Sequence, residues 1–386
     1  MPRTPARHTE PMPDRRSALE AWLTRQWQHW GLYTALTWPL HLLMRGLVGT
    51  RRVLYRLGLL QAIRLPVPVV MVGNRIAGGA GKTPTTLAVL EHLRHQGWHP
   101  GLLTRGHGGS ASQQAAPVLL DAHSAATLNA RVTGDEPWLL WQRSQVPIAI
   151  GRQRALAGQA LLKQHPDIDI LVCDDGLQHL ALARDLEIVV FDERGAGNGC
   201  LLPAGPLREP ADSPSAAIDG GPPLVLYNAT APSTQLPGHL GQRSLQRPQP
   251  WAPWATHGHR AGDHHAASTP APTLPPPDTS PEHTWAAAGI AQPTRFFQAL
   301  EAQGYRFSAL PLPDHATLSP LPWPPNSRHV ILTEKDAVKL TPEALAQHCP
   351  ATQVWVCPLD FSPEPAFWQA LDARLAPHRP RPARPT

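Results

Sequence analysis

The sequence is poor in lysine, in cysteine and in charge. Only four of its 386 residues are lysines, so arginine carries nearly all of the positive charge, and charged residues make up 16% of the chain, against roughly 25% in an average protein. The four cysteines are scattered without a CxxC pair. That scatter excludes a disulfide-stapled module and a cysteine-based zinc site, and it indicates a reducing compartment.

No cleavable secretory signal is expected, because the first apolar stretch begins only near Gly31 and has no small-residue cleavage site after it. A basic motif interleaved with aromatic residues is also missing, so nucleic acid is not an expected partner. The net charge of +5 favours anionic partners in general, such as phospholipids or phosphorylated substrates.

Proline, by contrast, is abundant. The chain has 46 prolines, more than twice the roughly 5% of an average protein, and they are dense, together with histidine, in residues 248–283. We expect this stretch to be a linker. The length predicts two or three domains: an N-terminal helical segment over residues 1–65, a first domain over residues 66–247 and a second over residues 284–386.

The first apolar stretch, residues 31–49, is expected to be an amphipathic helix. Its leucines share one face and its polar residues form a narrow opposite strip: Leu32, Leu36, Leu40, Leu43 and Leu47, and Thr34, Thr37, His41 and Arg45. Two interpretations stay open, a helix packed on the protein's own core and an anchor lying on a membrane surface. Tryptophans before the helix and arginines after it favour the anchor. A spanning helix is not expected, because Pro39, His41 and Arg45 interrupt the apolar run.

Short apolar runs alternate with helical patterns in the rest of the chain. This alternation predicts a mostly parallel sheet with helices on both faces. The predicted strands are residues 67–73, 101–104, 147–151, 168–175 and 187–192, with helices over 83–96, 136–143 and 152–164. A second α/β region is expected beyond the linker, with strands over residues 285–290, 330–333 and 353–357.

A glycine-rich turn joins the first predicted strand to a helix. It runs through Ile76, Ala77, Gly78, Gly79, Ala80, Gly81, Lys82 and Thr83. In such a turn the backbone N–H groups surround phosphate oxygens, the lysine reaches the β- and γ-phosphates, and the threonine hydroxyl can ligate Mg²⁺. These residues are therefore expected to bind ATP, although Ile76 stands where the consensus has its first glycine.

Two pairs of acidic residues follow. Asp174 and Asp175 end a buried strand, where P-loop proteins place the carboxylate that completes Mg²⁺ coordination. A cap on the next turn is the alternative for this pair. Asp135 and Glu136 precede a helix, and taken alone they suit an N-terminal helix cap equally well.

These motifs together resemble the tetraacyldisaccharide 4′-kinase family, the lipid A 4′-kinases of Gram-negative bacteria. The resemblance rests on ordered motifs that include VPVVMVGN, AGGAGKTP, TRGHGG, GDEP, DDGLQH, LLPAGPLREP, AQPTRFF, LPDH and LTEKDAVK. It covers nearly the whole chain apart from the extreme termini and the proline-rich linker.

The resemblance implies a P-loop NTPase-like, doubly wound and mostly parallel sheet, with a second, smaller α/β domain and an N-terminal membrane-associated helix. It also implies transfer of the γ-phosphoryl group of ATP, with Mg²⁺, to the 4′-hydroxyl of a tetraacylated glucosamine disaccharide 1-phosphate, which yields lipid IVA for lipopolysaccharide synthesis. The implied partners are this lipid substrate and the surface of the inner membrane, at its cytoplasmic face.

Site residues carry over by motif. Asp135 of GDEP and His315 of LPDH match the family's catalytic aspartate and histidine, which act with Lys82, so the second domain is expected to fold back over the phosphate loop. The residues expected near the lipid substrate are Glu136, Gln178, His179, Asn198 and Arg208. A membrane-associated P-loop ATPase that switches partner binding is the alternative function, and such a protein needs no lipid acceptor.

Overall fold

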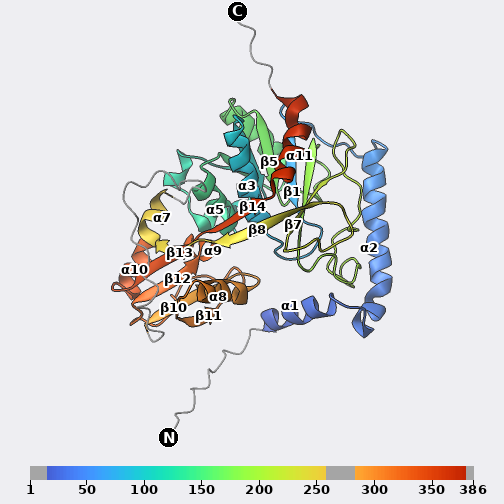
Figure 1. Cartoon of the computed structure of the whole chain (residues 1–386). Coiled ribbons are helices and arrows are strands. Elements are labelled where there is room, and N and C mark those ends of the chain that lie inside the picture. Colours follow the sequence, from blue (N-terminus) through green and yellow to red (C-terminus); the bar gives the residue numbers. More distant parts are fainter. Residues whose placement is uncertain (1–14, 258–282, 380–386) are drawn as a thin grey trace, which may run out of the picture.

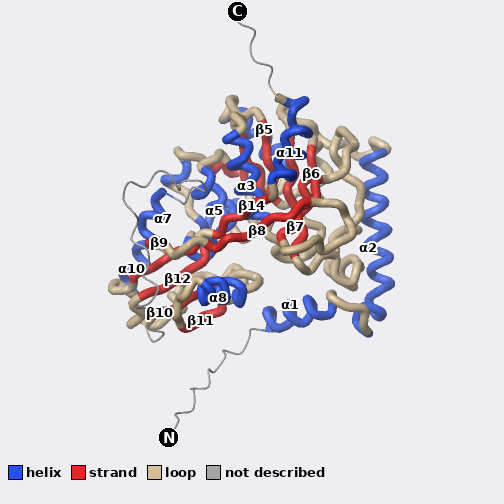
Figure 2. Tube along the Cα trace, in the orientation of Figure 1, coloured by secondary structure: helices blue, strands red, loops and turns tan. Residues whose placement is uncertain are grey.

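The computed structural model describes residues 15–257 and 283–379, which form two β-sheets with helices packed on them (Figures 1 and 2). The larger sheet has nine strands in the order β14-β8-β7-β6-β1-β5-β2-β4-β3. It is parallel except at its two edges, where β14 and β3 run antiparallel to their neighbours. The order confirms a doubly wound, mostly parallel sheet.

Five strands of the large sheet, β1, β2, β4, β5 and β6, follow the predicted runs closely, and four more were not predicted. The strands of this sheet are β1 (Val69–Gly73), β2 (Pro100–Thr104), β3 (Val118–Leu120), β4 (Ile148–Ile150), β5 (Ile170–Asp174), β6 (Leu186–Asp192), β7 (Leu224–Asn228), β8 (His239–Leu245) and β14 (Leu359–Pro363). The central ones are almost continuously apolar because helices cover both faces. Val70 and Val72 of β1 pack toward α3 (Lys82–His95), α5 (Asp135–Ser144) and α11 (Pro365–Leu375). Val69 and Met71 pack toward α6 (Arg154–Gln164).

The smaller sheet has five strands in the order β11-β10-β12-β13-β9. Its elements are β9 (Gln249–Pro250), α7 (Trp251–His257), β10 (Thr284–Ala288), α8 (Pro293–Ala302), β11 (Ser308–Pro311), β12 (His329–Thr333), α9 (Glu334–Ala337), α10 (Pro342–His348) and β13 (Gln353–Cys357). In Figure 1 this sheet lies at the lower left, on the side of the large sheet opposite to α2.

Two observations differ from the predicted division of the chain. The prediction that residues 248–283 form a linker is wrong for residues 249–257, because β9 pairs with β13 and Trp251 and Trp254 of α7 are buried. The indole rings supply the apolar area that orders this stretch. Residues 258–282 lie outside the described part of the chain. After β13 the chain also returns to the large sheet through β14, and the domain ranges 66–247 and 284–386 stay a prediction.

The N-terminal region contains α1 (Arg15–Gln26) and α2 (Leu32–Arg56), and a short α4 (Ala130–Thr133) follows β3. Helix α2 turns its polar strip toward the protein: Thr34 and His41 are buried, whereas Leu32 and Leu36 are 78% and 72% exposed. The buried polar groups are paired, since His41 Nδ1 accepts a hydrogen bond from Leu201 N–H at 2.8 Å. The leucine face therefore stays uncovered by the described chain. No helix in the described residues is at once long and apolar enough to cross a bilayer.

Candidate active site

The glycine-rich turn links β1 to α3 at the carboxyl edge of the large sheet. Gly78 and Gly81 have φ angles of +88° and +85°, a region that favours glycine. At Gly81 a Cβ atom would lie only 1.8 Å from Asn228 Nδ2, so no side chain fits there. Ile76, which replaces a consensus glycine, is buried and pairs with Leu207 in a short antiparallel bridge. The substitution thus anchors the loop to the segment that precedes Arg208.

Three further residues of the loop, Ala77, Gly79 and Ala80, are fixed by backbone hydrogen bonds or by burial. Ala77 N–H donates to Pro206 O at 2.7 Å, Gly79 O accepts from Arg194 Nη2 at 2.8 Å, and Ala80 is buried. Arg194 also pairs with Asp192 at the end of β6. These bonds join the loop to Pro206 and to Arg194.

Lys82 and Thr83 begin α3. Lys82 Nζ lies 3.6 Å from Asp175 Oδ1 and 3.4 Å from Asn74 Oδ1. Arg208 Nη1 contacts the same Asp175 oxygen at 3.1 Å. Burial alone would raise the pKa of Asp175, but Lys82 and Arg208 hold it below its usual value. Asp175 is therefore a carboxylate facing two cations at the mouth of the loop.

Asp174 is the last residue of β5 and is buried, with Oδ1 accepting from Thr86 Oγ1 at 2.9 Å. Burial, with added repulsion from Glu136 and Asp175, raises its pKa to about 7. A bound cation, in addition to Lys82, would offset the repulsion and favour the charged form of the Asp174 carboxyl. Thr83, Asp174 and Asp175 offer oxygen ligands alone, which is the donor set that Mg²⁺ prefers.

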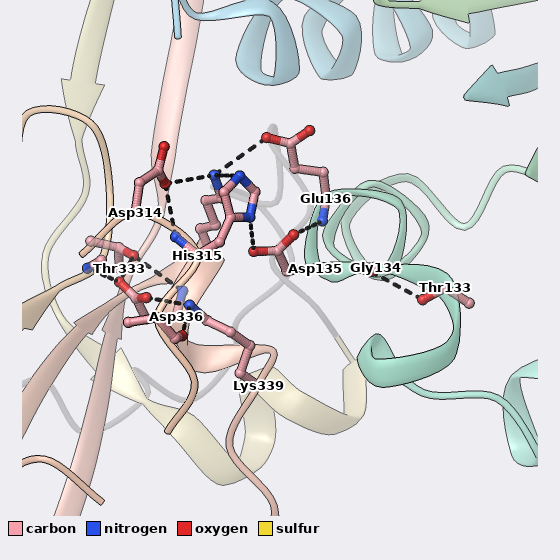
Figure 3. Close-up of polar contacts among 12 residues, drawn as sticks. Thr133, Gly134, Asp135, Glu136, Asp314, His315, Thr333, Asp336 and Lys339 are labelled. Carbon is pink, nitrogen blue, oxygen red and sulfur yellow. Dashed lines mark hydrogen bonds and ion pairs between the residues drawn. The ribbon is translucent and has the colours of Figure 1, made fainter. Parts of the chain in front are cut away.

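Asp135 and His315 meet although 180 positions separate them: His315 Nδ1 lies 3.0 Å from Asp135 Oδ2 (Figure 3). Asp135 begins α5 and is buried. His315 follows β11 with a φ of +60°, which is uncommon outside glycine. Burial raises the pKa of Asp135, yet the hydrogen bond to His315 and the charge of Lys335 bring it below its usual value. The same hydrogen bond raises the pKa of His315.

Of the residues predicted near the substrate, Glu136 lies beside this centre and Gln178 lies beside the start of the phosphate loop; the binding role of all five stays a prediction. Glu136 Oε1 is 3.4 Å from Lys335 Nζ. Gln178 Nε2 donates to Asn74 O at 3.2 Å and to Glu209 Oε1 at 3.0 Å. Burial, together with Arg154 and Arg184, lowers the pKa of His179 to about 4, so its ring is neutral near pH 7.

Both polar atoms of the Asn198 side-chain amide form hydrogen bonds within the protein. Nδ2 donates to Thr34 Oγ1 at 3.1 Å and to Ala204 O at 2.9 Å, and Oδ1 accepts from Cys200 N–H at 3.0 Å. The side chain is buried under α2. These contacts favour a role in docking α2 on the segment 195–209.

A cavity of about 790 Å³ opens between the two sheets. The phosphate loop lines it through Gly81, Lys82 and Thr83, and the C-terminal part of the chain lines it through Phe296 and Lys335. Arg243 of β8 and Arg295 of α8 also line it. Sequence reasoning missed both arginines: Arg243 lies in no motif, Arg295 of AQPTRFF was given no role, and only the folded chain brings them beside the loop.

Comparison with known protein families and proteins shows that the chain matches one family over most of its length. The model of the tetraacyldisaccharide-1-P 4′-kinase family matches residues 33–376. Over 371 residues, 96% of this chain and 98% of the relative, the chain is 50% identical to the tetraacyldisaccharide 4′-kinase of Methylibium petroleiphilum. Over 365 residues, 94% of this chain and 98% of the relative, it is 49% identical to that of Leptothrix cholodnii.

One solved structure with the same fold is the "apo" form of LpxK from Aquifex aeolicus in complex with ATP. Its TM-score is 0.66 at 20% identity, over 89% of this chain and 99% of that chain; at this identity the likeness supports the fold alone. The family model spans most of the chain and the relatives match over nearly their whole length. This chain therefore belongs to the tetraacyldisaccharide 4′-kinase family.

Proposed function

We propose that this chain transfers the γ-phosphoryl group of ATP to the 4′-hydroxyl of a tetraacylated glucosamine disaccharide 1-phosphate. The observation that carries the proposal is the hydrogen bond between Asp135 and His315, at the edge of a cavity that the phosphate loop also lines. A kinase needs both a grip on the nucleotide and a group that receives the proton of the attacking hydroxyl.

The phosphate loop supplies the grip on the nucleotide. Backbone N–H groups of the glycine turn and the N-terminus of α3 would bind the phosphate oxygens. Lys82 would leave Asp175 for the γ-phosphate, and Thr83 with Asp174 or Asp175 would hold Mg²⁺. When bound, Mg²⁺ neutralises charge that develops on the transferred group.

The Asp135–His315 pair would orient the sugar hydroxyl and take up its proton as the oxygen attacks phosphorus. Proton removal by a positioned base typically contributes about 10²–10⁴-fold to a rate. Because α5 supplies the carboxylate and the loop after β11 supplies the imidazole, the base is complete only when both parts of the chain are in contact. Such contact also excludes water that would otherwise hydrolyse ATP.

The leucine face of α2 supports binding at a membrane surface, and we place it at the cytoplasmic face of the bacterial inner membrane. Exposed leucines bind to lipid at little cost when the polar strip of the same helix is already paired with the protein. The segment 195–209 connects this helix to the phosphate loop, since Asn198 contacts Thr34 and Leu207 pairs with Ile76. The acylated acceptor would thus approach along this segment.

Incubation of the purified protein with Mg-ATP and the tetraacyldisaccharide 1-phosphate tests the proposal. The expected product carries a new 4′-phosphate and forms in proportion to ADP. The Lys82→Ala variant should lose at least about 10²-fold in rate, because it lacks charge on the phosphates, whereas Lys163→Ala, on the exposed side of α6, should retain the rate. ATP hydrolysis without lipid product would contradict the proposal and favour an ATPase switch.

A further inference from the structure

Lys335 contacts three polar groups at the edge of the cavity. Its Nζ lies 3.1 Å from Asp314 Oδ1, 3.2 Å from His315 Nε2 and 3.4 Å from Glu136 Oε1. The side chain is 17% exposed. An ammonium group has three N–H bonds and no lone pair, so each of these contacts matches one donor.

The lysine stays charged in this setting. Burial lowers its pKa, but Glu136, Asp314 and Asp135 outweigh that effect and raise it above its usual value. A charged lysine can only donate, and its partner His315 Nε2 must then accept. An imidazole that accepts at Nε2 is neutral and carries its proton at Nδ1, the atom that faces Asp135 Oδ2.

We propose that Lys335 is a positioning residue that holds His315 as the neutral tautomer protonated at Nδ1. The inference rests on the proposed function: with Nδ1 protonated toward Asp135, Nε2 keeps the lone pair that would take up the proton of the sugar hydroxyl once that hydroxyl replaces the Lys335 N–H group at this nitrogen. Asp135 favours the imidazolium and Lys335 opposes it, since a second positive charge beside Nε2 is unfavourable. Glu136 and Asp314 hold the lysine in place from opposite sides of the cavity.

A second ion pair fixes the same geometry. Arg143 of α5 lies 2.7 Å from Glu334, the residue before Lys335, while Glu136 of the same helix pairs with Lys335 itself. Two ion pairs therefore join α5 to α9: in one the cation lies on α5, and in the other it lies on α9. They keep Lys335 at a defined distance from Asp135 and His315.

The charged and titratable groups around the ring come from several elements. Asp135 and Glu136 lie on α5, Asp314 is adjacent in the chain, and Lys335 and Lys339 lie on and after α9; the His107 ring is 6.0 Å away between centroids. Of these, Lys335 is the group that contacts Nε2 in the described structure. Removing its charge should therefore raise the pH at which His315 titrates.

Histidine ¹⁵N NMR on the full-length, nucleotide-free protein tests this directly. In the wild type, above its titration, His315 should show a protonated Nδ1 and an unprotonated Nε2. In Lys335→Met the midpoint of the titration should rise by roughly half to one pH unit, and Lys335→Arg should restore the wild-type midpoint. Lys163→Met, an exposed lysine on α6, is the matched control and should change nothing.

Kinetics give the second readout. Lys335→Met should lower kcat at pH 7 by roughly 5-fold, regain rate at higher pH, and change KM for ATP by less than about 2-fold. An Nε2-protonated ring in the wild type, or an unchanged midpoint in the variant, would overturn the inference. A raised KM for ATP with an unchanged pH profile would overturn it too, by placing Lys335 on the nucleotide. If no lipid product forms with any variant, the proposed kinase function fails. The NMR titration still decides the role of Lys335, so the two failures can be distinguished.

Discussion

Arg143 Nη1 lies 2.7 Å from Glu334 Oε1, and the two side chains are only 3% and 6% exposed. Arg143 also contacts Asp360 at 2.8 Å. This buried pair joins α5, which carries Asp135, to α9, which carries Lys335. Breaking it leaves a guanidinium with one partner in a site that excludes water.

Glu334→Ala should lower the free energy of unfolding by about 3 kcal/mol, because the buried guanidinium of Arg143 loses one of its two carboxylate partners and keeps only Asp360. Urea unfolding measures the change. Asp219→Ala removes a partly exposed pair with Arg374, in which the two side chains are 43% and 22% exposed, and should cost less than about 1 kcal/mol. Equal losses in the two variants would contradict a structural role for the buried pair.

Asp135→Asn should lower kcat by about 10²–10⁴-fold and leave KM for ATP within about 3-fold of the wild type, because the neutral amide cannot balance the positive charge that His315 gains with the proton, yet it keeps the shape of the carboxylate. Steady-state kinetics with the lipid acceptor measure both constants. Asp167→Asn, an exposed aspartate before β5, is the control and should leave both unchanged. A parallel rise in KM would instead assign Asp135 to nucleotide binding.

Replacing Leu36 and Leu43 of α2 by glutamine should weaken binding to vesicles of anionic phospholipid by at least about 10-fold, since each leucine contributes up to about 1.5–3 kcal/mol when fully buried in lipid. The fold should not change, because both side chains are exposed. Sedimentation with vesicles measures the binding. Leu156→Gln, at an exposed leucine on α6, should bind as the wild type does, and equal binding by the α2 variant would show that the anchor lies elsewhere.

His179 should make the protein sensitive to mild acid. Its pKa is about 4 in the folded chain, against an ordinary value of 6.5. The unfolded chain therefore binds the additional proton first, and the free energy of unfolding falls as the pH drops from about 6.5 toward 4. His179→Gln should reduce this slope in urea unfolding at pH 5 and pH 7, while His123→Gln, at an exposed histidine, should not. An identical slope in both variants would mean that the His179 ring is not held neutral by burial.

Sequence patterns predicted much of the fold and part of the site. The strands β1, β2, β4, β5 and β6 lie within one or two residues of the predicted ranges, because runs of apolar residues bounded by turns report burial on both faces. The phosphate loop was predictable for a similar reason. Its glycines mark backbone angles that other residues rarely adopt, and Lys82 and Thr83 follow at fixed positions in the chain.

Other features had no local signal. Trp251 and Trp254 are surrounded by proline and polar residues in the sequence, and only their contact with the small sheet explains why they are buried. Asn198 was predicted to contact the substrate because it offers an amide, and the sequence had no signal for the hydrogen bonds that this amide makes to Thr34 and Ala204. In both cases the deciding partner is distant in the chain.

The local amino-acid sequence determined most of the central strands, the phosphate loop and the amphipathic character of α2, because backbone angles and side-chain periodicity depend on neighbouring residues. Tertiary packing alone set which face of α2 turns outward, because an amphipathic helix can pack by either side until its polar residues find buried partners, as His41 does when it accepts a hydrogen bond from Leu201 N–H. It alone also joined Asp135 to His315 and to Lys335. A catalytic geometry depends on distances across the fold, and residues far apart in sequence acquire those distances only when the two sheets pack together.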